Sequence, residues 1–121
     1  MAVSNYQDLI VWQKAMDLTV EVYKIVKKLP KEELYSLSNQ IRRAAVSIPS
    51  NIAEGQERYS KKEFIHFLLI AISSNAELQT QLLICIKVGY LADTDISDAM
   101  ELSKEIGKML NALIKKTGTA Q

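Results

Sequence analysis

The stretch "RRAAVSIPSNIAEG", from Arg42 to Gly55, decides how this chain of 121 residues folds. Its apolar residues recur every three to four positions, which predicts a helix with one buried face. Pro49 interrupts the pattern, because proline inside a helix removes one backbone hydrogen bond and crowds the carbonyl four residues earlier, here that of Ala45. We therefore predict a helix over about 36–55 that is kinked at Pro49.

A polar stripe runs beside the apolar one in the same segment. Ser47, Asn51 and Glu54 are spaced by four and three residues, so they share one face of the helix. Three interpretations of this candidate polar contact surface stay open: a solvated edge, a hydrogen-bonded contact with another helix or subunit, and a ligand site. Gly55 is expected in the left-handed conformation that often closes a helix.

The helical period recurs in three further segments, at about residues 8–28, 61–88 and 94–116. Ser60 and Glu63 form a capping box at the start of the second of these, which Gly89 is expected to close. No segment alternates as a strand does, and the short connections favour antiparallel neighbours. We predict an all-α fold, an antiparallel up-down-up-down four-helix bundle that makes residues 1–121 a single domain.

The segment at 61–88 has more apolar residues than one buried face requires. From Phe64 to Ile86 they leave little of the helix circumference polar, which is typical of a helix covered on more than one side. Four helices of this length do not supply enough protein to cover it. We therefore expect part of this face to meet another copy of the chain.

Composition limits the possible partners. Apolar residues make up 48% of the chain and the net charge is +1, which excludes a mainly disordered protein and a uniformly basic nucleic-acid binder. A surface for phosphates must then be local. If copies of the chain assemble into a ring, its candidate contacts would form a basic rim. The alternative is that these residues form only a solvated surface. These candidate nucleic-acid contacts are Arg42, Arg43, Arg58, Lys61 and Lys62.

The aromatic residues at helical spacing are expected in the core or in a subunit interface rather than stacked on bases, which would require exposure in a basic groove. They are Tyr6, Trp12, Tyr23, Phe64 and Phe67. The longest apolar run, Phe64 to Ile72, is shorter than the roughly 20 residues that span a bilayer, and the N-terminus lacks the features of a signal peptide. We expect a cytoplasmic protein with no membrane partner.

No reactive constellation is evident. A di-iron bundle needs two E-x-x-H motifs, and the chain has one, Glu63 to His66, which contains its only histidine. Neither a G-x-S-x-G motif nor a glycine-rich phosphate loop is present. Cys85, the single cysteine, lies between two isoleucines and is expected to be a buried apolar residue. The sequence predicts no enzyme activity, metal, cofactor or small-molecule substrate.

Three stretches together resemble a known family: "YQDLIVWQKAMDL", "QIRRAAVSIPSNIAEG" and "KKEFIHFLLIAISSNAELQTQLLI". They are similar to the four-helix-bundle proteins encoded in intervening sequences of 23S ribosomal RNA genes, over about residues 5–116. The resemblance implies a bacterial, cytoplasmic homopentamer without established enzyme activity. The family is distantly similar to the accessory protein of diversity-generating retroelements, which contacts nucleic acid. We expect a self-assembling module, with a nucleic-acid-binding ring that uses the basic rim as the alternative.

Overall fold

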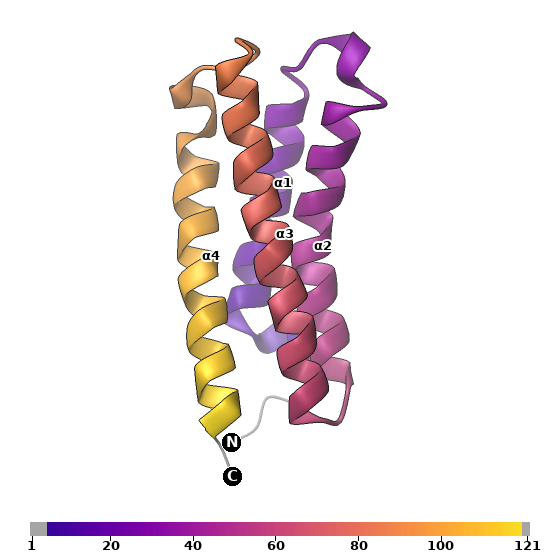
Figure 1. Ribbon diagram of the computed structural model, residues 1–121, viewed down its shortest axis with the longest axis vertical. Helices are drawn as coiled ribbons and strands as arrows, with labels where there is room; N and C mark the ends of the chain where they lie inside the picture. The colour runs from indigo at the N-terminus through magenta and orange to yellow at the C-terminus, as the bar shows by residue number, and fades with distance from the viewer. Residues whose placement is uncertain (1–4, 120–121) are drawn as a thin grey trace.

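The computed structural model describes residues 5–119 and contains no strand among them. The elements in chain order are η1 (Tyr6–Asp8), α1 (Ile10–Val26), η2 (Lys31–Glu33), α2 (Leu37–Glu57), α3 (Lys61–Lys87) and α4 (Asp93–Thr119). Consecutive helices run antiparallel and pack side by side, and α4 returns to pack against α1 (Figure 1). Helices α1 and α3 therefore lie diagonally across the bundle. The predicted all-α four-helix bundle is confirmed.

Two helix ends illustrate where the sequence was read correctly and where it was not. Gly89 closes α3 with φ +86°, and the N–H of Tyr90 donates to the carbonyl of Cys85 at 2.9 Å, as in a Schellman motif. Gly55 was expected to close α2 in the same way, and this prediction is wrong. Helix α2 continues to Glu57, with Gly55 buried inside it.

Gly55 is required for close approach instead of for a turn. A Cβ atom placed on it would lie 2.8 Å from the Cβ of Phe67 on α3, closer than such atoms pack. The absence of a side chain therefore lets α2 and α3 meet where the chain reverses. Helix α4 also differs from its predicted bounds, because it runs to Thr119 rather than to about residue 116.

Each helix contributes fully buried aliphatic side chains to one core, for example Leu18, Ile48, Leu78 and Ile106. Cys85 is also fully buried, which confirms its expected role as a small apolar residue, and burial raises the pKa of its thiol. A raised pKa keeps the thiol protonated and unreactive near neutral pH. The core is thus apolar along most of the bundle axis.

Pro49 is accommodated by a side chain from another helix. Helix α2 runs through Pro49 without interruption, and the predicted kink stays a prediction. Proline leaves the carbonyl of Ala45 without its usual donor, and the hydroxyl of Thr19 on α1 donates to that carbonyl at 3.3 Å as well as to Ala15 at 2.8 Å. Thr19 therefore satisfies a buried backbone group that the proline would otherwise leave unpaired.

A buried polar cluster joins α3 to α4 near the middle of the bundle. The amide of Asn75 donates to the carbonyl of Ser103 at 2.9 Å, while the hydroxyl of Ser103 donates to the Asn75 carbonyl oxygen at 2.6 Å. Gln79 donates to the same hydroxyl at 2.8 Å. A satisfied network of this kind, surrounded by aliphatic side chains, fixes the register of the two helices, because a shift along the axis would unpair its members.

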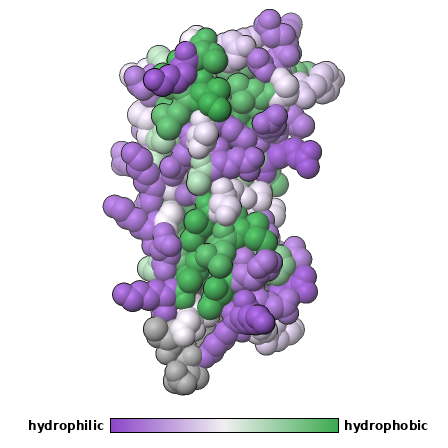
Figure 2. Space-filling view, viewed as in Figure 1, coloured by the Kyte–Doolittle hydropathy of each residue, from purple (hydrophilic) through white to green (hydrophobic). Residues whose placement is uncertain are grey.

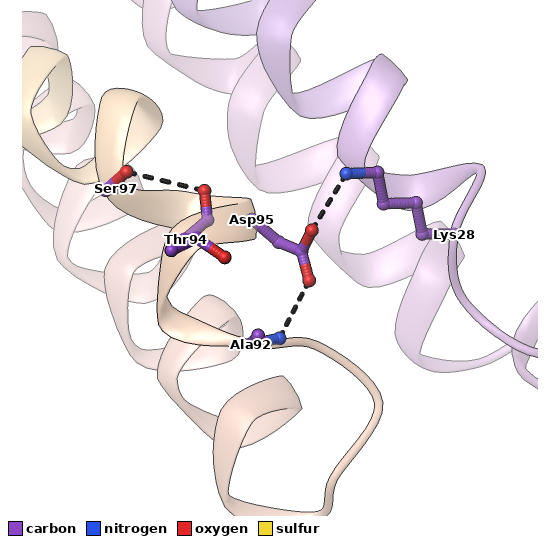
Figure 3. Close-up of polar contacts among 5 residues, drawn as sticks. All are labelled: Lys28, Ala92, Thr94, Asp95 and Ser97. Atoms are coloured by element: carbon purple, nitrogen blue, oxygen red, sulfur yellow. Dashed lines mark hydrogen bonds and ion pairs between the residues drawn. The ribbon is translucent and has the colours of Figure 1, made fainter.

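The loop end of the bundle, where α1 meets η2 and α3 meets α4, is held by more exposed polar contacts. Asp95 accepts hydrogen bonds from Lys28 and from the N–H of Ala92, both at 2.8 Å (Figure 3). These contacts lower the pKa of Asp95, with the bond from Lys28 as the main cause. The hydroxyl of Tyr90 donates to Glu33 at 2.7 Å. Both contacts tie the first connection of the chain to the last.

Helix α3 is long and apolar enough to cross a membrane by length and composition. In this structure it instead packs between α2 and α4 and has buried residues from Leu68 to Cys85. A helix that packs between two others in a bundle can be equally long and apolar. Packing in the core therefore explains part of the apolar composition of α3.

Candidate functional site

The predicted polar contact surface divides into two parts. The hydroxyls of Ser47 on α2 and Ser74 on α3 lie 2.8 Å apart, and the amide of Asn51 donates to the Ser47 hydroxyl at 2.9 Å. Glu54 is exposed and accepts a hydrogen bond from Arg58 at 2.9 Å. Ser47 thus makes a contact between two helices of the same chain, Asn51 supports Ser47 from within α2, and Glu54 lies on the solvated edge.

The candidate nucleic-acid contacts also separate into two groups. Arg42 and Arg43 lie in the first half of α2, whereas Arg58, Lys61 and Lys62 surround the connection from α2 to α3. At about 1.5 Å per helical residue, the two groups are about 22 Å apart along the bundle axis. Within one protomer they do not form a single basic surface.

The group at the connection is largely offset by carboxylates. Arg58 lies 2.9 Å from Glu54 and 3.7 Å from Glu63, and its guanidinium stacks over the ring of Phe67 at 5.2 Å from the centroid. The N–H of Glu63 donates to the Ser60 hydroxyl, which confirms Ser60 as the N-cap of α3. Arg58 therefore contributes to the local structure, and the net positive charge of this end is small.

The group on α2 lies in a different setting, a groove between α1 and α2 that continues toward η2. Four cations and four further polar side chains line it: Lys27, Lys31, Arg42, Arg43, Tyr23, Ser38, Asn39 and Ser47. Its described lining contains no aspartate or glutamate. Arg42 is held in place by a hydrogen bond to the carbonyl of Leu34 at 3.4 Å. We call this surface the basic groove.

For Tyr23 the structure excludes the core, which was one of the two expected positions of the aromatic residues, and leaves a subunit interface as a prediction. Trp12 does pack against the core and lies edge-on to Tyr6, with ring centroids 5.3 Å apart. Tyr23 is instead 44% exposed and lies beside Arg42 in the basic groove. An exposed ring in a basic groove is the arrangement that base stacking requires.

Sequence reasoning missed Lys27 and Lys31 as partners of Arg42. A lysine at the end of a helix, such as Lys27, is explained by the helix dipole alone, so it does not indicate a site. Tyr23, Lys27 and Lys31 are spaced by four residues, which places the first two on one face of α1. That spacing could have indicated the groove, although the sequence does not show that Arg42 faces it.

A second surface is apolar and lies on the outer side of α3. Leu69, Leu83, Ile84 and Val88 are between 42% and 55% exposed there. Figure 2 shows hydrophobic residues gathered on the front of the molecule, where α3 runs in Figure 1, in two areas separated by a paler band. The outer face of α3, as we call it, has no covering element within the part of the chain that the structure describes.

A third surface is the groove between α1 and α4 near the start of α1. Apolar side chains of Leu9, Ile10, Met109 and Leu113 line it, and Ile10 is 60% exposed. The groove has a volume of about 460 Å³. It differs in position and composition from the outer face of α3, so the protomer carries two distinct apolar surfaces.

Residues 5–119 contain no group of three or more His, Cys, Asp or Glu side chains placed to hold a metal ion. His66 is exposed, and Glu63 lies near Arg58. The apolar surfaces offer association through apolar contact, and the basic groove offers recognition of anions.

The comparisons with known proteins agree with this architecture. The family model for the 23S rRNA-intervening sequence protein matches residues 7–112, which include all but the end of the fourth helix. This chain belongs to the 23S rRNA-intervening sequence protein family. The resemblance found in the sequence is thereby confirmed. Among curated proteins, none matches the chain.

A solved structure is also similar to this member of the 23S rRNA-intervening sequence protein family. It is a crystal structure of a protein with unknown function from the S23 ribosomal protein family of Bacteroides thetaiotaomicron VPI-5482. The two structures agree with a TM-score of 0.81 and 29% sequence identity, over 88% of this chain and 99% of the other. The chain thus belongs to a family of unknown function, which is not a known enzyme family.

Proposed function

We propose that this protein is a non-enzymatic module that assembles with copies of itself into a ring. The observation that carries the proposal is the uncovered outer face of α3, where Leu69, Leu83 and Ile84 are each more than 40% exposed. Burial of apolar area is the main driving force of association between subunits. Large aliphatic side chains exposed in two areas along one helix are costly in water, and a second copy removes that cost.

The presence of two different apolar surfaces supports a ring over a simple pair. A two-fold dimer needs one self-complementary surface, whereas contact between two different surfaces repeats from copy to copy until it closes. Here the outer face of α3 and the groove between α1 and α4 can serve as the two halves of such a contact. Five copies is the number that the family resemblance implies, and the apolar surfaces themselves set no number.

The mass of the purified protein tests the proposal. We expect sedimentation equilibrium at micromolar concentration to give a multiple of the protomer mass of 13.6 kDa, and five times 13.6 kDa, or 68 kDa, for a pentamer. The double variant Leu69→Lys, Leu83→Lys should sediment as a single protomer with its helical circular dichroism unchanged. A wild-type protein that sediments as a protomer would contradict the proposal.

The matched control is Met16→Lys with Val20→Lys on α1, which adds the same two charges at exposed apolar positions. Val20 is 55% exposed, as apolar as the leucines, and lies outside both surfaces. We expect this variant to keep the wild-type mass. An equal loss of assembly in the control would show that added charge, rather than the outer face of α3, is responsible.

A further inference from the structure

Four cations without an ion pair to a described carboxylate lie together in the basic groove, whereas others of this kind, such as Lys87 and Lys104, lie elsewhere, on α3 and α4. Ion pairs to carboxylates engage Lys14, Lys24, Lys28 and Arg58 on other parts of the surface. None of the four cations that line the basic groove forms an ion pair with a described carboxylate. The groove therefore concentrates positive charge in a protein whose net charge is only +1.

The cations of the basic groove differ in how close they lie to carboxylates. Toward α3 the basic groove adjoins a hollow that shares Asn39, Arg43 and Ser47 with it and also contains Glu77, so Arg43 is partly offset on that side. Neither of the two hollows that Arg42 lines contains a described carboxylate, and its guanidinium donates to the Leu34 carbonyl at 3.4 Å. Lys27 and Lys31 are exposed at the end of the groove that is nearer the loops.

The groove also has the dimensions of a short stretch of polymer. Its lining on α2 extends from Ser38 to Ser47, or about 14 Å at 1.5 Å per residue. Along the axis of a stacked strand, one phosphate occurs about every 3.4 Å, so the length of the groove corresponds to about four phosphates. Tyr23 offers a ring among the cations, and the amide of Asn39 adds a neutral donor and acceptor.

We infer that the basic groove, with Tyr23, Lys27, Arg42 and Arg43, binds a short segment of single-stranded nucleic acid. The cations contact phosphates, and Tyr23 stacks on an unpaired base. A single strand fits better than a duplex because paired bases are stacked on each other and offer no free face to the ring. This inference does not depend on self-assembly, because the groove lies apart from both apolar surfaces.

Fluorescence anisotropy with labelled oligonucleotides tests the inference on the full-length protein. The probes are single strands of about 16 deoxythymidines or 16 uridines and a duplex of the same length. At about 50 mM salt we expect both single strands to bind more tightly than the duplex, and binding to weaken steeply at about 200 mM. The thymidine and uridine arms show whether DNA or RNA is preferred. Absence of single-strand binding at low salt would overturn the inference.

Variants then locate the site. Arg42→Ala with Arg43→Ala should weaken single-strand binding about tenfold at low salt and reduce the salt slope by about 1.4, which corresponds to two phosphates at about 0.7 each. Tyr23→Ala should weaken binding by about 5- to 150-fold, while Tyr23→Phe retains it. If Arg42→Ala prevents folding, the exposed pair Lys27→Ala, Lys31→Ala replaces it with the same expectation.

The matched control is Lys104→Ala with Lys108→Ala. It removes two exposed cations from α4, outside the basic groove, and leaves the net charge equal to that of the arginine variant. We expect its affinity to stay within about twofold of wild type. An equal loss in this control, or equally tight binding of polyglutamate that competes with the oligonucleotide, would overturn a nucleic-acid site in the groove.

Discussion

The middle of the bundle and its loop end use the same kinds of polar contact in opposite surroundings. In the middle, Asn75 and Ser103 bond to each other at less than a tenth exposure. At the loop end, Lys28 and Asp95 form an equally short bond that water reaches, with their side chains 56% and 27% exposed. A buried polar group cannot exchange its partner for water, whereas an exposed one can. Hydrogen bonds of similar length therefore contribute different amounts to the free energy of unfolding.

The largest expected effect comes from the buried cluster. Asn75→Ala removes both bonds to Ser103 and leaves a space between α3 and α4, so we expect the free energy of unfolding to fall by about 2–3 kcal/mol. Urea denaturation followed by circular dichroism measures this change. The matched control is Asn111→Ala, because Asn111 also donates its amide to a backbone carbonyl of α4 but is exposed. Its effect should stay below about 0.5 kcal/mol. Equal losses in the two variants would remove the distinction between buried and exposed contacts.

An intermediate effect is expected where Thr19 covers the carbonyl of Ala45. Thr19→Val keeps the shape of the side chain and removes the donor, and we expect a loss of about 1 kcal/mol. In a Pro49→Ala background, residue 49 regains an N–H that can donate to the carbonyl of Ala45. Thr19→Val should therefore lower the free energy of unfolding by less in that background than in the wild type. A double-mutant cycle by urea denaturation measures this coupling. Strictly additive losses would mean that Thr19 does not compensate for the proline.

The loop end should respond to pH. Hydrogen bonds, first from Ser36 and then from Tyr90, lower the pKa of Glu33, and the bond from Lys28 lowers that of Asp95. Both carboxylates have a lower pKa in the folded than in the unfolded chain. Their stabilisation is therefore present above the unfolded value of about 4 and is lost as the pH falls through the folded values. We expect the melting temperature to fall as the pH is lowered below about 4. In the double variant Glu33→Gln, Asp95→Asn, we expect the melting temperature to fall less steeply over the same range. An unchanged slope in this variant would assign the acid sensitivity to other carboxylates.

The smallest effect is expected for Lys28→Met. The methionine keeps the apolar stem and removes one exposed ion pair, which is worth little in water. We expect a melting temperature close to that of wild type at low salt, and no difference at about 1 M salt, where the pair is screened. A large loss that persists in high salt would show that the contact in Figure 3 is not an ordinary exposed ion pair.

The fold was predictable because the helical period is local. Apolar positions such as Ile41, Ile48 and Ile52 repeat along the chain, and they are the ones that the structure buries. Ser60 and Gly89 mark helix ends by their own chemistry, so they too were found. Gly55 misled the prediction because a glycine that permits a turn and one that permits close packing look the same in a sequence.

The candidate site was only partly predictable. Arg42 and Arg43 were named as contacts from their sequence, together with Arg58, Lys61 and Lys62, because all five are basic. The bundle separates the first two residues from the other three, because α2 carries the chain about 22 Å along the bundle axis between Arg43 and Arg58. It brings Arg42 to Tyr23 on α1 instead. No pattern within either helix indicates that pairing, which depends on how α1 and α2 are rotated against each other.

The sequence by itself determined the number of helices, most of their ends, the excess of apolar residues on α3 and the family to which the chain belongs. These properties depend on the spacing of residues close in the chain. Only the tertiary structure decided that Thr19 covers the carbonyl left by Pro49, that Asn75 meets Ser103, and that Tyr23 is exposed among cations. Such contacts join residues far apart in sequence, and they follow from the packing of whole helices, which minimises exposed apolar area over the entire chain.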